Sequence, residues 1–566
     1  MTPVIQIRPT DVVIFSVALY IVRALIRGRK KGYTTPLNGP PTKSIVFGLS
    51  RYLNSVDDPG KVMEDWAGEY GSVYKIPTVL GGTKVVICDP RAIRDFYSKE
   101  TFTYVGTPIA KTFIARVFGR GLLWSEGESH KRQRKALTPA FSNAAIRRLT
   151  SVFYDSAYKL KIHWDNELLN HPDGLVIDVQ NWMNHISLDS IGIAGFSHDF
   201  GSLDGKPSAI VDAFESIGSS KPSPVGTVIF LLSFVFPFLN SLPTERSRML
   251  MSLKRSMREI ADVLLERSRQ AREEGGAEDK SIIGLLIKAE SAGGELHMTE
   301  EEVLAQMVRN VLLLAGYETT SISLTWALIE LAKQPEKQER LRKELLSVSG
   351  GADPTWDQLM GLDYPYLDAV VHETLRMHPP LGETARVATE DDILPLSAPF
   401  TTADGQVVNS IAVTKGTTVS APIRCINRAE AIWGPRAKEF IPERWLDFSE
   451  DDKDKADTEK EANSKIDWMR TEEKAKLWGE DGIPPTVREV QGHKHLLTFS
   501  DGPRTCLGKS FALAEFKAAL SVLIRNYLIS FDDPETKIGL QRAILPRPKV
   551  EGCDGAKVPM RVKRVE

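Results

Sequence analysis

The sequence has few cysteines for its length and lacks the marks of a secreted protein. Only four cysteines occur in 566 residues, and they lie far apart, at Cys88, Cys425, Cys506 and Cys553. None belongs to a C-x-x-C pair, so the spacing excludes a disulfide framework and the common zinc motifs. The chain also has no Asn-x-Ser/Thr acceptor for glycosylation. We therefore expect the protein to work in a reducing compartment.

The sequence also lacks an excess of charge of one sign. Its 72 lysines and arginines balance 74 aspartates and glutamates, which leaves a formal net charge of -2. Without a basic excess to neutralise phosphates, nucleic acid is excluded as a partner. A G-x-G-x-x-G fingerprint for a dinucleotide is missing as well. The hydrophobic share of 42% is that of an ordinary globular protein.

An uninterrupted apolar run long enough to cross a bilayer is lacking at the N-terminus. The stretch Val12–Ile26 is broken by Arg23, whereas a spanning helix needs about 20 apolar residues. Cationic residues at 27–31 follow it directly and predict that this flank faces the cytosol. We expect residues 1–34 to form a membrane anchor, either a single spanning helix or an amphipathic helix in the interface. The proline-rich stretch Pro36–Pro41 then predicts a stiff hinge.

The remainder, residues 35–566, is interpreted as one large domain. Strand composition occurs at Val73–Ile76 and Lys84–Ile87, and a β-rich segment lies between Phe400 and Ala421. Elsewhere apolar residues recur at helical spacing. The clearest helical segments are Asp262–Gln270, Glu301–Leu331, Pro335–Leu346, Tyr366–His378 and Ser510–Leu528. Residues 449–482 are dense in Asp, Glu and Lys and predict a charged surface insertion.

The segment Phe499–Gly508 places one cysteine among glycines at the start of a predicted helix. Cys506 would lie just before the helix N-terminus, where the positive end of the helix dipole favours a thiolate. The glycines let the backbone turn tightly and approach a flat cofactor. A thiolate is the iron ligand that assists cleavage of the O–O bond.

This segment resembles the haem-binding loop of the cytochrome P-450 superfamily, F-x-x-G-x-R-x-C-x-G, at every fixed position. The resemblance implies haem b with Cys506 as axial ligand, and Phe499 and Gly508 beside the cofactor. It also implies a mainly α fold with small β-sheets, in which the haem lies between the Cys506 loop and a long distal helix. The chain is most similar to membrane-bound fungal members.

The distal helix of the family carries A/G-G-x-D/E-T, and residues Ala315–Thr319 match it. The resemblance implies that the Thr319 hydroxyl holds dioxygen and that Glu318 helps deliver protons. Ala315 and Gly316 are expected to leave room for O₂ and substrate, with Ala315 against the cofactor.

Glu373 and Arg376 have the E-x-x-R spacing of the family, and Arg444 belongs to its later P-E-R segment. The spacing alone says little, because it recurs at Glu339/Arg342 and elsewhere in surface pairs. The resemblance implies that Glu373, Arg376 and Arg444 form a buried network that holds the loop under the haem.

Four residues match positions that bind haem propionates in the family. Arg134 keeps the arginine of W-x-x-x-R, whereas His130 replaces its tryptophan and can still donate a ring N–H. Arg386 and Arg504 match two further arginines, whose forked donors suit carboxylates. The neighbouring cations Lys131, Arg132 and Lys135 are either an attraction for an acidic reductase or a plain solvated face.

The apolar segment Gly226–Leu239 is too short to span a bilayer and contains Pro237. We interpret it as a lipid-dipping lid that admits apolar substrates, with a buried helix as the alternative. By resemblance, residues 102–118 and 380–385 also line the substrate.

The resemblance implies a monooxygenase that inserts one oxygen atom of O₂ into an apolar substrate. Electrons would come from NADPH through a separate flavoprotein reductase, with cytochrome b5 as an optional second donor. The implied place is the endoplasmic reticulum membrane, with the catalytic domain in the cytosol. Two alternatives remain open: a haem-thiolate isomerase or dehydratase that needs no reductase, and a non-catalytic haem carrier.

Overall fold

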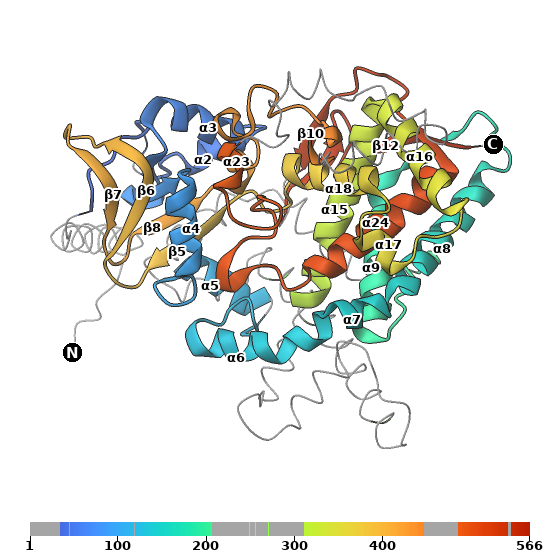
Figure 1. The fold of residues 1–566 in the computed structure, drawn as a ribbon, viewed down its shortest axis with the longest axis horizontal. Coiled ribbons are helices and arrows are strands. Elements are labelled where there is room, and N and C mark those ends of the chain that lie inside the picture. The colour runs from blue at the N-terminus through green and yellow to red at the C-terminus, as the bar shows by residue number, and fades with distance from the viewer. Residues whose placement is uncertain are drawn as a thin grey trace, which may run out of the picture.

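The computed structural model describes residues 34–206, 311–446 and 485–565, apart from residues 43, 45, 118 and 542–544; between 206 and 311 it describes only Arg248, Arg255 and Gln270. This part of the chain is mainly α-helical and carries four small sheets (Figure 1). The prediction of a mainly α fold with small β-sheets is therefore confirmed.

Helices α3 and α4 begin at aspartates that cap them. The Asp58 carboxylate accepts the N–H groups of Gly60 and Lys61 at the start of α3, and Asp89 caps α4 in the same way. The longer helices are α3 (Pro59–Tyr70), α4 (Pro90–Ser98), α5 (Pro108–Val117), α6 (Gly127–Leu137), α8 (Thr150–Leu168), α9 (Val179–Phe196), α15 (Val311–Lys333), α16 (Pro335–Ser349), α18 (Pro365–Met377) and α24 (Lys509–Asn526). Short helices are α2 (Ser50–Leu53), α7 (Asn143–Arg147), α17 (Trp356–Met360), α19 (Ile423–Ile426), α20 (Glu430–Trp433) and α23 (Pro485–Arg488).

The largest sheet has the order β1-β2-β8-β5-β3, and it combines an early segment of the chain with a much later one. Its strands are β1 (Val73–Pro77), β2 (Thr83–Ile87), β8 (Thr418–Ala421), β5 (Thr384–Ala388) and β3 (Tyr104–Gly106). Strand β2 pairs parallel to β8, which brings the two segments together. The β-rich segment expected between Phe400 and Ala421 in fact begins earlier, at β5.

The other sheets are smaller and antiparallel. One has the order β4-β12-β9, and the remaining two are the pairs β6–β7 and β10–β11. Their strands are β4 (Leu175–Asp178), β12 (Pro559–Arg564), β9 (Tyr527–Ser530), β6 (Asp392–Thr401), β7 (Val407–Val413), β10 (Ile538–Gln541) and β11 (Arg547–Val550).

One hydrophobic core holds the helices that carry the candidate site. Helix α9 packs along α15, α8 packs along α24, and α15 also contacts α24. Most residues of α24 from Phe511 onward are buried, so this helix is held in the core, whereas its first two residues are half-buried. Figure 1 shows this helical part on the right, with the β1-β2-β8-β5-β3 sheet and the β6–β7 hairpin at the opposite end.

Several predicted segments lie outside the described residues. They are the anchor at 1–34 except for its last residue, the lid Gly226–Leu239, the helix Asp262–Gln270 except for its last residue, and the charged insertion at 449–482. Among the residues that the structure does describe, no helix is both long and apolar enough to span a membrane. Thr34 and Thr35 already contact the domain, because they hydrogen-bond to Thr414 and Ala412.

Candidate functional site

The Cys506 loop leads directly into a buried helix. Gly508 is the N-cap of α24, and the Cys506 N–H donates to the Phe499 carbonyl at 2.8 Å. Gly502 has a φ of +63°, and a Cβ there would collide with the Tyr97 carbonyl oxygen. Gly508 has a φ of -84° and room for a Cβ beside Phe141. We predicted that the glycines of this loop are needed for a tight backbone turn. That prediction is confirmed at Gly502, but it is wrong at Gly508.

Cys506 is the only exposed residue among the four cysteines; Cys425 is buried, and Cys88 and Cys553 are half-buried. The surrounding protein still raises the pKa of the Cys506 thiol through desolvation. The Gly508 N–H, Arg134 and Lys509 oppose this rise by favouring a negative sulfur. These groups would stabilise a thiolate, but burial outweighs them, so the pKa of the free thiol is raised and not lowered as the helix dipole alone predicted.

The four predicted propionate-binding residues come together from three separate elements. His130 and Arg134 lie on α6, Arg386 lies on β5, and Arg504 lies in the short 3-10 helix η6 (Gly502–Arg504) before Cys506. All three arginines act on the His130 ring, whose pKa falls to about 3 because the ring is buried among cations. His130 is therefore neutral, with one ring N–H to donate.

Two glutamates beside these cations were not predicted. Glu126 forms an ion pair with Arg504, and the fully buried Glu100 lies 3.0 Å from the Arg386 Nε. Burial raises the pKa of Glu100 to about 7, against the pull of Arg386 and Arg504. Neither glutamate stands in a recognisable motif, so only the folded chain reveals them.

This donor set fits the carboxylates of a haem. Among the described residues, the buried Nε of Arg504 donates no hydrogen bond, whereas the Nε of Arg386 lies against Glu100. Buried guanidinium donors that lack an acceptor are costly, and a carboxylate can accept from them in pairs. The cluster also lies near the Cys506 sulfur, since Arg134 acts electrostatically on both Cys506 and Arg504.

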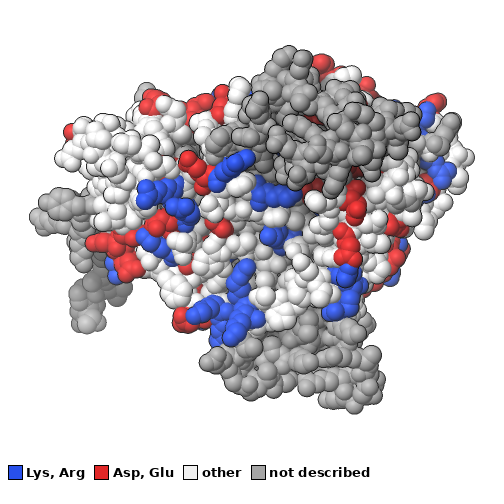
Figure 2. All heavy atoms as spheres, viewed as in Figure 1, with Lys and Arg blue, Asp and Glu red and all other residues white. Residues whose placement is uncertain are grey.

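Lys131 and Lys135 of the same helix point to solvent. Lys131 lies 3.7 Å from the exposed Glu128, and Figure 2 shows lysine and arginine side chains gathered over the α6 end of this face.

Helix α15 presents Ala315 and Thr319 on its open side. The Thr319 hydroxyl donates to the Ala315 carbonyl at 2.6 Å, which leaves the hydroxyl oxygen free to accept. Gly316 does not provide open space as expected. A Cβ there would lie 2.9 Å from Cγ1 of Ile191, so Gly316 serves the close packing of α15 on α9.

Glu318 is buried and contacts a partner that the sequence did not indicate. Arg547 of β11 donates to the Glu318 Oε1 at 3.1 Å and to the Tyr317 hydroxyl at 3.1 Å. The Glu318 Oε2 is buried without a hydrogen-bond partner in the described chain. Desolvation raises the pKa of Glu318 although Arg547 opposes it. The fold therefore favours the protonated form of Glu318 more than water does.

A second buried acid, on α24, faces residues of α9 and α15. Glu515 of α24 is fully buried, and burial raises its pKa well above the ordinary range. Ser187 and Ser190 of α9 and Thr320 of α15 face it, and their hydroxyls favour its charged form only weakly. This cluster was not predicted, because its four residues come from three helices.

The structure brings Glu373, Arg376 and Arg444 into one buried network. Arg376 makes two bonds to Glu373, at 2.8 and 2.9 Å, and the Arg444 Nε donates to the same carboxylate at 2.9 Å. The Trp445 ring N–H and the Ile441 backbone N–H complete a shell of five donors. The cations lower the pKa of Glu373 to about 2, against its burial.

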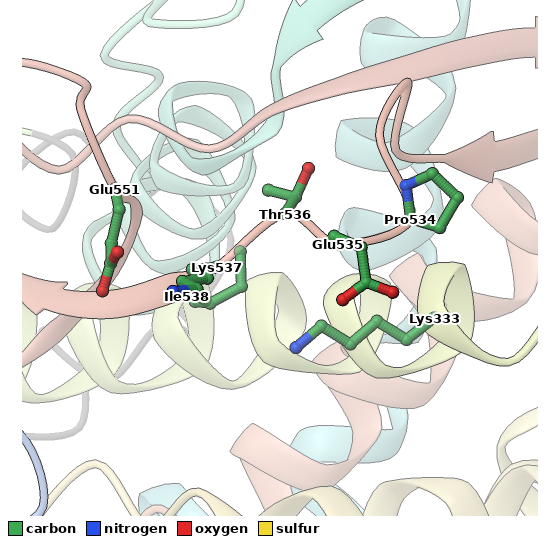
Figure 3. A pocket seen from close by; sticks show the side chains of 7 residues that line it. All are labelled: Lys333, Pro534, Glu535, Thr536, Lys537, Ile538 and Glu551. Atoms are coloured by element: carbon green, nitrogen blue, oxygen red, sulfur yellow. The ribbon is translucent and has the colours of Figure 1, made fainter.

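One surface hollow among the described residues lies elsewhere. It holds about 540 Å³ and is lined by residues of the loop before β10, with Lys333 at the end of α15 and Glu551 after β11. Figure 3 shows the Lys333 and Glu535 side chains facing each other across its edge. None of the predicted site residues lines this hollow.

Known proteins resemble the chain over its whole length. The sequence model of the cytochrome P-450 family matches residues 38–552. Cytochrome P-450 monooxygenase claP of Ampulloclitocybe clavipes is 61% identical, and claQ of the same fungus is 59% identical, each over 100% of both chains. Cytochrome P-450 monooxygenase 205 of Postia placenta is 34% identical over 94% of this chain and 93% of its own. With these likenesses and the geometry above, the chain belongs to the cytochrome P-450 monooxygenases.

Proposed function

We propose that the protein inserts one atom of O₂ into a small apolar compound, by hydroxylation or epoxidation, and reduces the other atom to water. The observation that carries this proposal is the pairing of an exposed Cys506 at the start of α24 with a threonine-bearing helix that packs against α24. When bound, a haem with a thiolate ligand supplies the activation of dioxygen.

The residues of the chain divide the remaining work. Cys506 would hold the iron, and Arg134, Arg386, Arg504 and His130 would bind the propionates through their N–H groups. Phe499, Gly508 and Ala315 would contact the ring.

On the distal side, the Thr319 hydroxyl oxygen is placed to accept a hydrogen bond, because its own proton is donated to Ala315. The Glu318 carboxyl group would hold a proton for delivery, since desolvation raises its pKa.

We propose that electrons reach the protein from NADPH through a separate flavoprotein reductase, with cytochrome b5 as an optional second donor. The chain has no dinucleotide fingerprint of its own. The apolar composition of the predicted lid favours an apolar substrate, from secondary metabolism or a xenobiotic.

The first test is the difference spectrum of the reduced protein with carbon monoxide. We expect the long-wavelength band of thiolate ligation, its loss in Cys506→Ala, and its retention in the control Cys553→Ala, since Cys553 is half-buried and remote in sequence. A wild-type protein that repeatedly gave only the short-wavelength band would refute Cys506 as the ligand.

A second measurement separates the proposal from its alternatives. Substrate-dependent consumption of NADPH with a reductase present is expected for a monooxygenase. Product formed without reductase or NADPH would instead identify an isomerase or dehydratase. Turnover of no compound in a broad substrate panel would favour a haem carrier.

We also propose that residues 1–33 anchor the protein to the endoplasmic reticulum membrane, with the catalytic domain in the cytosol. The support is the apolar stretch Val12–Ile26 followed by cations at 27–31. A truncation should begin at Thr34, because Thr34 and Thr35 hydrogen-bond to the domain. It should reduce sedimentation with membranes and keep the haem; unchanged sedimentation would show that the segment is not the main anchor.

A further inference from the structure

Glu126 connects two of the elements that surround the predicted propionate site. Its Oε1 accepts the Gly106 backbone N–H of β3 at 2.7 Å, and its Oε2 forms an ion pair with the Arg504 guanidinium of η6. Both side chains are largely buried, with 16% of Glu126 and 10% of Arg504 exposed. One carboxylate therefore joins β3 to a residue that lies 378 positions further along the chain than Glu126.

The backbone on both sides of Glu126 is fixed as well. The Ser125 carbonyl accepts from the Arg504 Nη2 at 2.5 Å, and the Gly127 N–H donates to the Thr101 carbonyl at 2.8 Å. The carboxylate therefore stands on a backbone that is already held in place, and it loses little further freedom when it binds Arg504.

These contacts use one nitrogen of Arg504 and leave another without an acceptor. The Nη2 donates to Ser125 and to Glu126, whereas the Nε is buried and has no hydrogen-bond partner among the residues that the structure describes. A buried donor without an acceptor is costly. A propionate would supply the acceptor, because a carboxylate can accept from two nitrogens of one guanidinium group.

The charge of the cluster leaves room for a further carboxylate. Three arginines, Arg134, Arg386 and Arg504, face two glutamates, Glu100 and Glu126. Even with both glutamates ionised, one positive charge remains. Glu126 therefore compensates only part of the positive charge, and a propionate is still attracted to the arginines.

We propose that Glu126 is a positioning residue, which holds the Arg504 guanidinium in the orientation in which its free Nε donates to a haem propionate. This inference rests on the proposed function, because it assumes that the protein binds haem beside Cys506. Glu126 itself needs no contact with the haem. It belongs to none of the motifs that predicted the propionate-binding residues.

The first test is the rate at which the holoenzyme loses its haem to an excess of apomyoglobin. We expect Glu126→Ala to raise this rate on the order of 10-fold, because Arg504 can then turn away from the propionate. Glu126→Gln should raise it less, since the amide oxygen can still accept from Arg504. The matched control is Glu128→Ala, which removes the same charge two residues away, at an exposed side chain 3.7 Å from Lys131. This control should leave the rate unchanged.

A second measurement separates positioning from a merely structural role. The propionate bending band in the resonance Raman spectrum of the holoenzyme responds to hydrogen bonds at the propionates. We expect Glu126→Ala and Arg504→Ala to shift this band in the same direction. The double variant should shift it no further than Arg504→Ala alone, since Glu126 acts through Arg504. Should Glu126→Ala fail to fold, Glu126→Gln carries both measurements.

Three results would overturn the proposal. One is faster haem loss in Glu126→Ala with an unchanged propionate band, because a structural role alone has that effect. Another is an effect of Glu126→Ala that persists in full in the Arg504→Ala background. The third is haem loss that is unchanged or slower in Glu126→Ala, and slower loss would show that the Glu126 charge repels the propionates.

The failure of this inference differs from the failure of the proposed function. A wild-type protein without the thiolate band would remove the function and, with it, the premise. A wild-type protein with that band, whose haem retention does not depend on Glu126, would leave the function intact and refute only the positioning.

Discussion

Glu373 and Glu318 are both buried glutamates in contact with arginine, but they are surrounded very differently. Glu373 accepts five hydrogen bonds, from Arg376, Arg444, Trp445 and the Ile441 backbone. Glu318 accepts from Arg547 at 3.1 Å, and its second oxygen has no partner within the described residues. The pKa of Glu373 falls to about 2, whereas that of Glu318 rises.

The difference shows that burial beside an arginine does not by itself decide the charge of a carboxyl group. Desolvation is the largest influence at both sites, and it favours the neutral form. At Glu373 two cations and a full shell of donors outweigh it, so the group is a fixed anion suited to a structural role. At Glu318 one cation does not outweigh it, and the group can take up and release a proton.

The largest effect should follow from breaking the complete network. Glu373→Gln replaces a shared anion by a neutral amide whose N–H₂ group faces other donors, and it leaves the buried cations Arg376 and Arg444 without that counter-charge. We expect a loss of about 3–5 kcal/mol in the free energy of unfolding, with loss of haem. Chemical denaturation and the ratio of haem to protein measure both.

The matched control for that variant is Glu439→Gln. Glu439 pairs with Arg436 at 2.7 Å, but both side chains are about half exposed, at 55% and 46%. Water screens such a pair, so the change should be about 0.5 kcal/mol or less. Equal losses in the two variants would show that the shell around Glu373 gives it no special role in stability.

An intermediate effect, on chemistry more than on stability, is expected for Glu318→Gln. The amide oxygen can still accept from Arg547, so the free energy of unfolding should fall by only about 1 kcal/mol. The amide cannot release a proton, however, and product formation should fall on the order of 100-fold. The measurement is product formed and NADPH consumed at saturating reductase. A stability loss as large as that of Glu373→Gln, with normal turnover, would contradict the proposed role.

Local patterns in the sequence predicted one of these two sites much better than the other. Glu373 and Arg376 are three residues apart on one helix, so their proximity follows from helical spacing. Arg444 was found through its place in a family motif. Arg547, in contrast, lies 229 residues from Glu318 in the sequence. No local pattern indicates which strand end will lie against α15, and the same limit hid Glu100 and the Ser187–Ser190–Glu515 cluster.

The helices were predicted well where tertiary packing agrees with apolar spacing. The predicted helix Tyr366–His378 corresponds to α18, and Ser510–Leu528 corresponds to α24. The second prediction ran two residues too far, because Tyr527 and Leu528 leave the helix to pair with β12. The prediction that Gly316 leaves open space was wrong for a similar reason. Its close packing against α9 cannot be seen in the sequence of α15 alone.

The smallest effect concerns pH, and it sharpens the contrast between the two glutamates. The variant Trp445→Phe removes one donor from Glu373 and is mild enough to keep the network. Between about pH 5 and 8, Glu373 is ionised in the folded and the unfolded chain, because its pKa is lowered in the one and ordinary in the other. The difference in the free energy of unfolding between wild type and Trp445→Phe should therefore stay constant over this range. It should shrink only at lower pH, as Glu373 takes up a proton.

The difference in the free energy of unfolding between wild type and Glu318→Gln should change over the same pH range. The folded protein keeps the Glu318 proton to a higher pH than the unfolded chain does, since the pKa of Glu318 is raised only in the fold. The unfolded chain then binds fewer protons, so this contribution to stability falls as the pH rises from about 4.5 through the folded pKa, by at most about 1.4 kcal/mol per pH unit. The amide of the Glu318→Gln variant cannot titrate, so the variant lacks this slope. Denaturation of wild type and both variants at intervals from pH 5 to 8 measures the two differences. If neither difference changed with pH, Glu318 would be ionised in the folded protein over this range. Glu318 and Glu373 would then differ only in their positions.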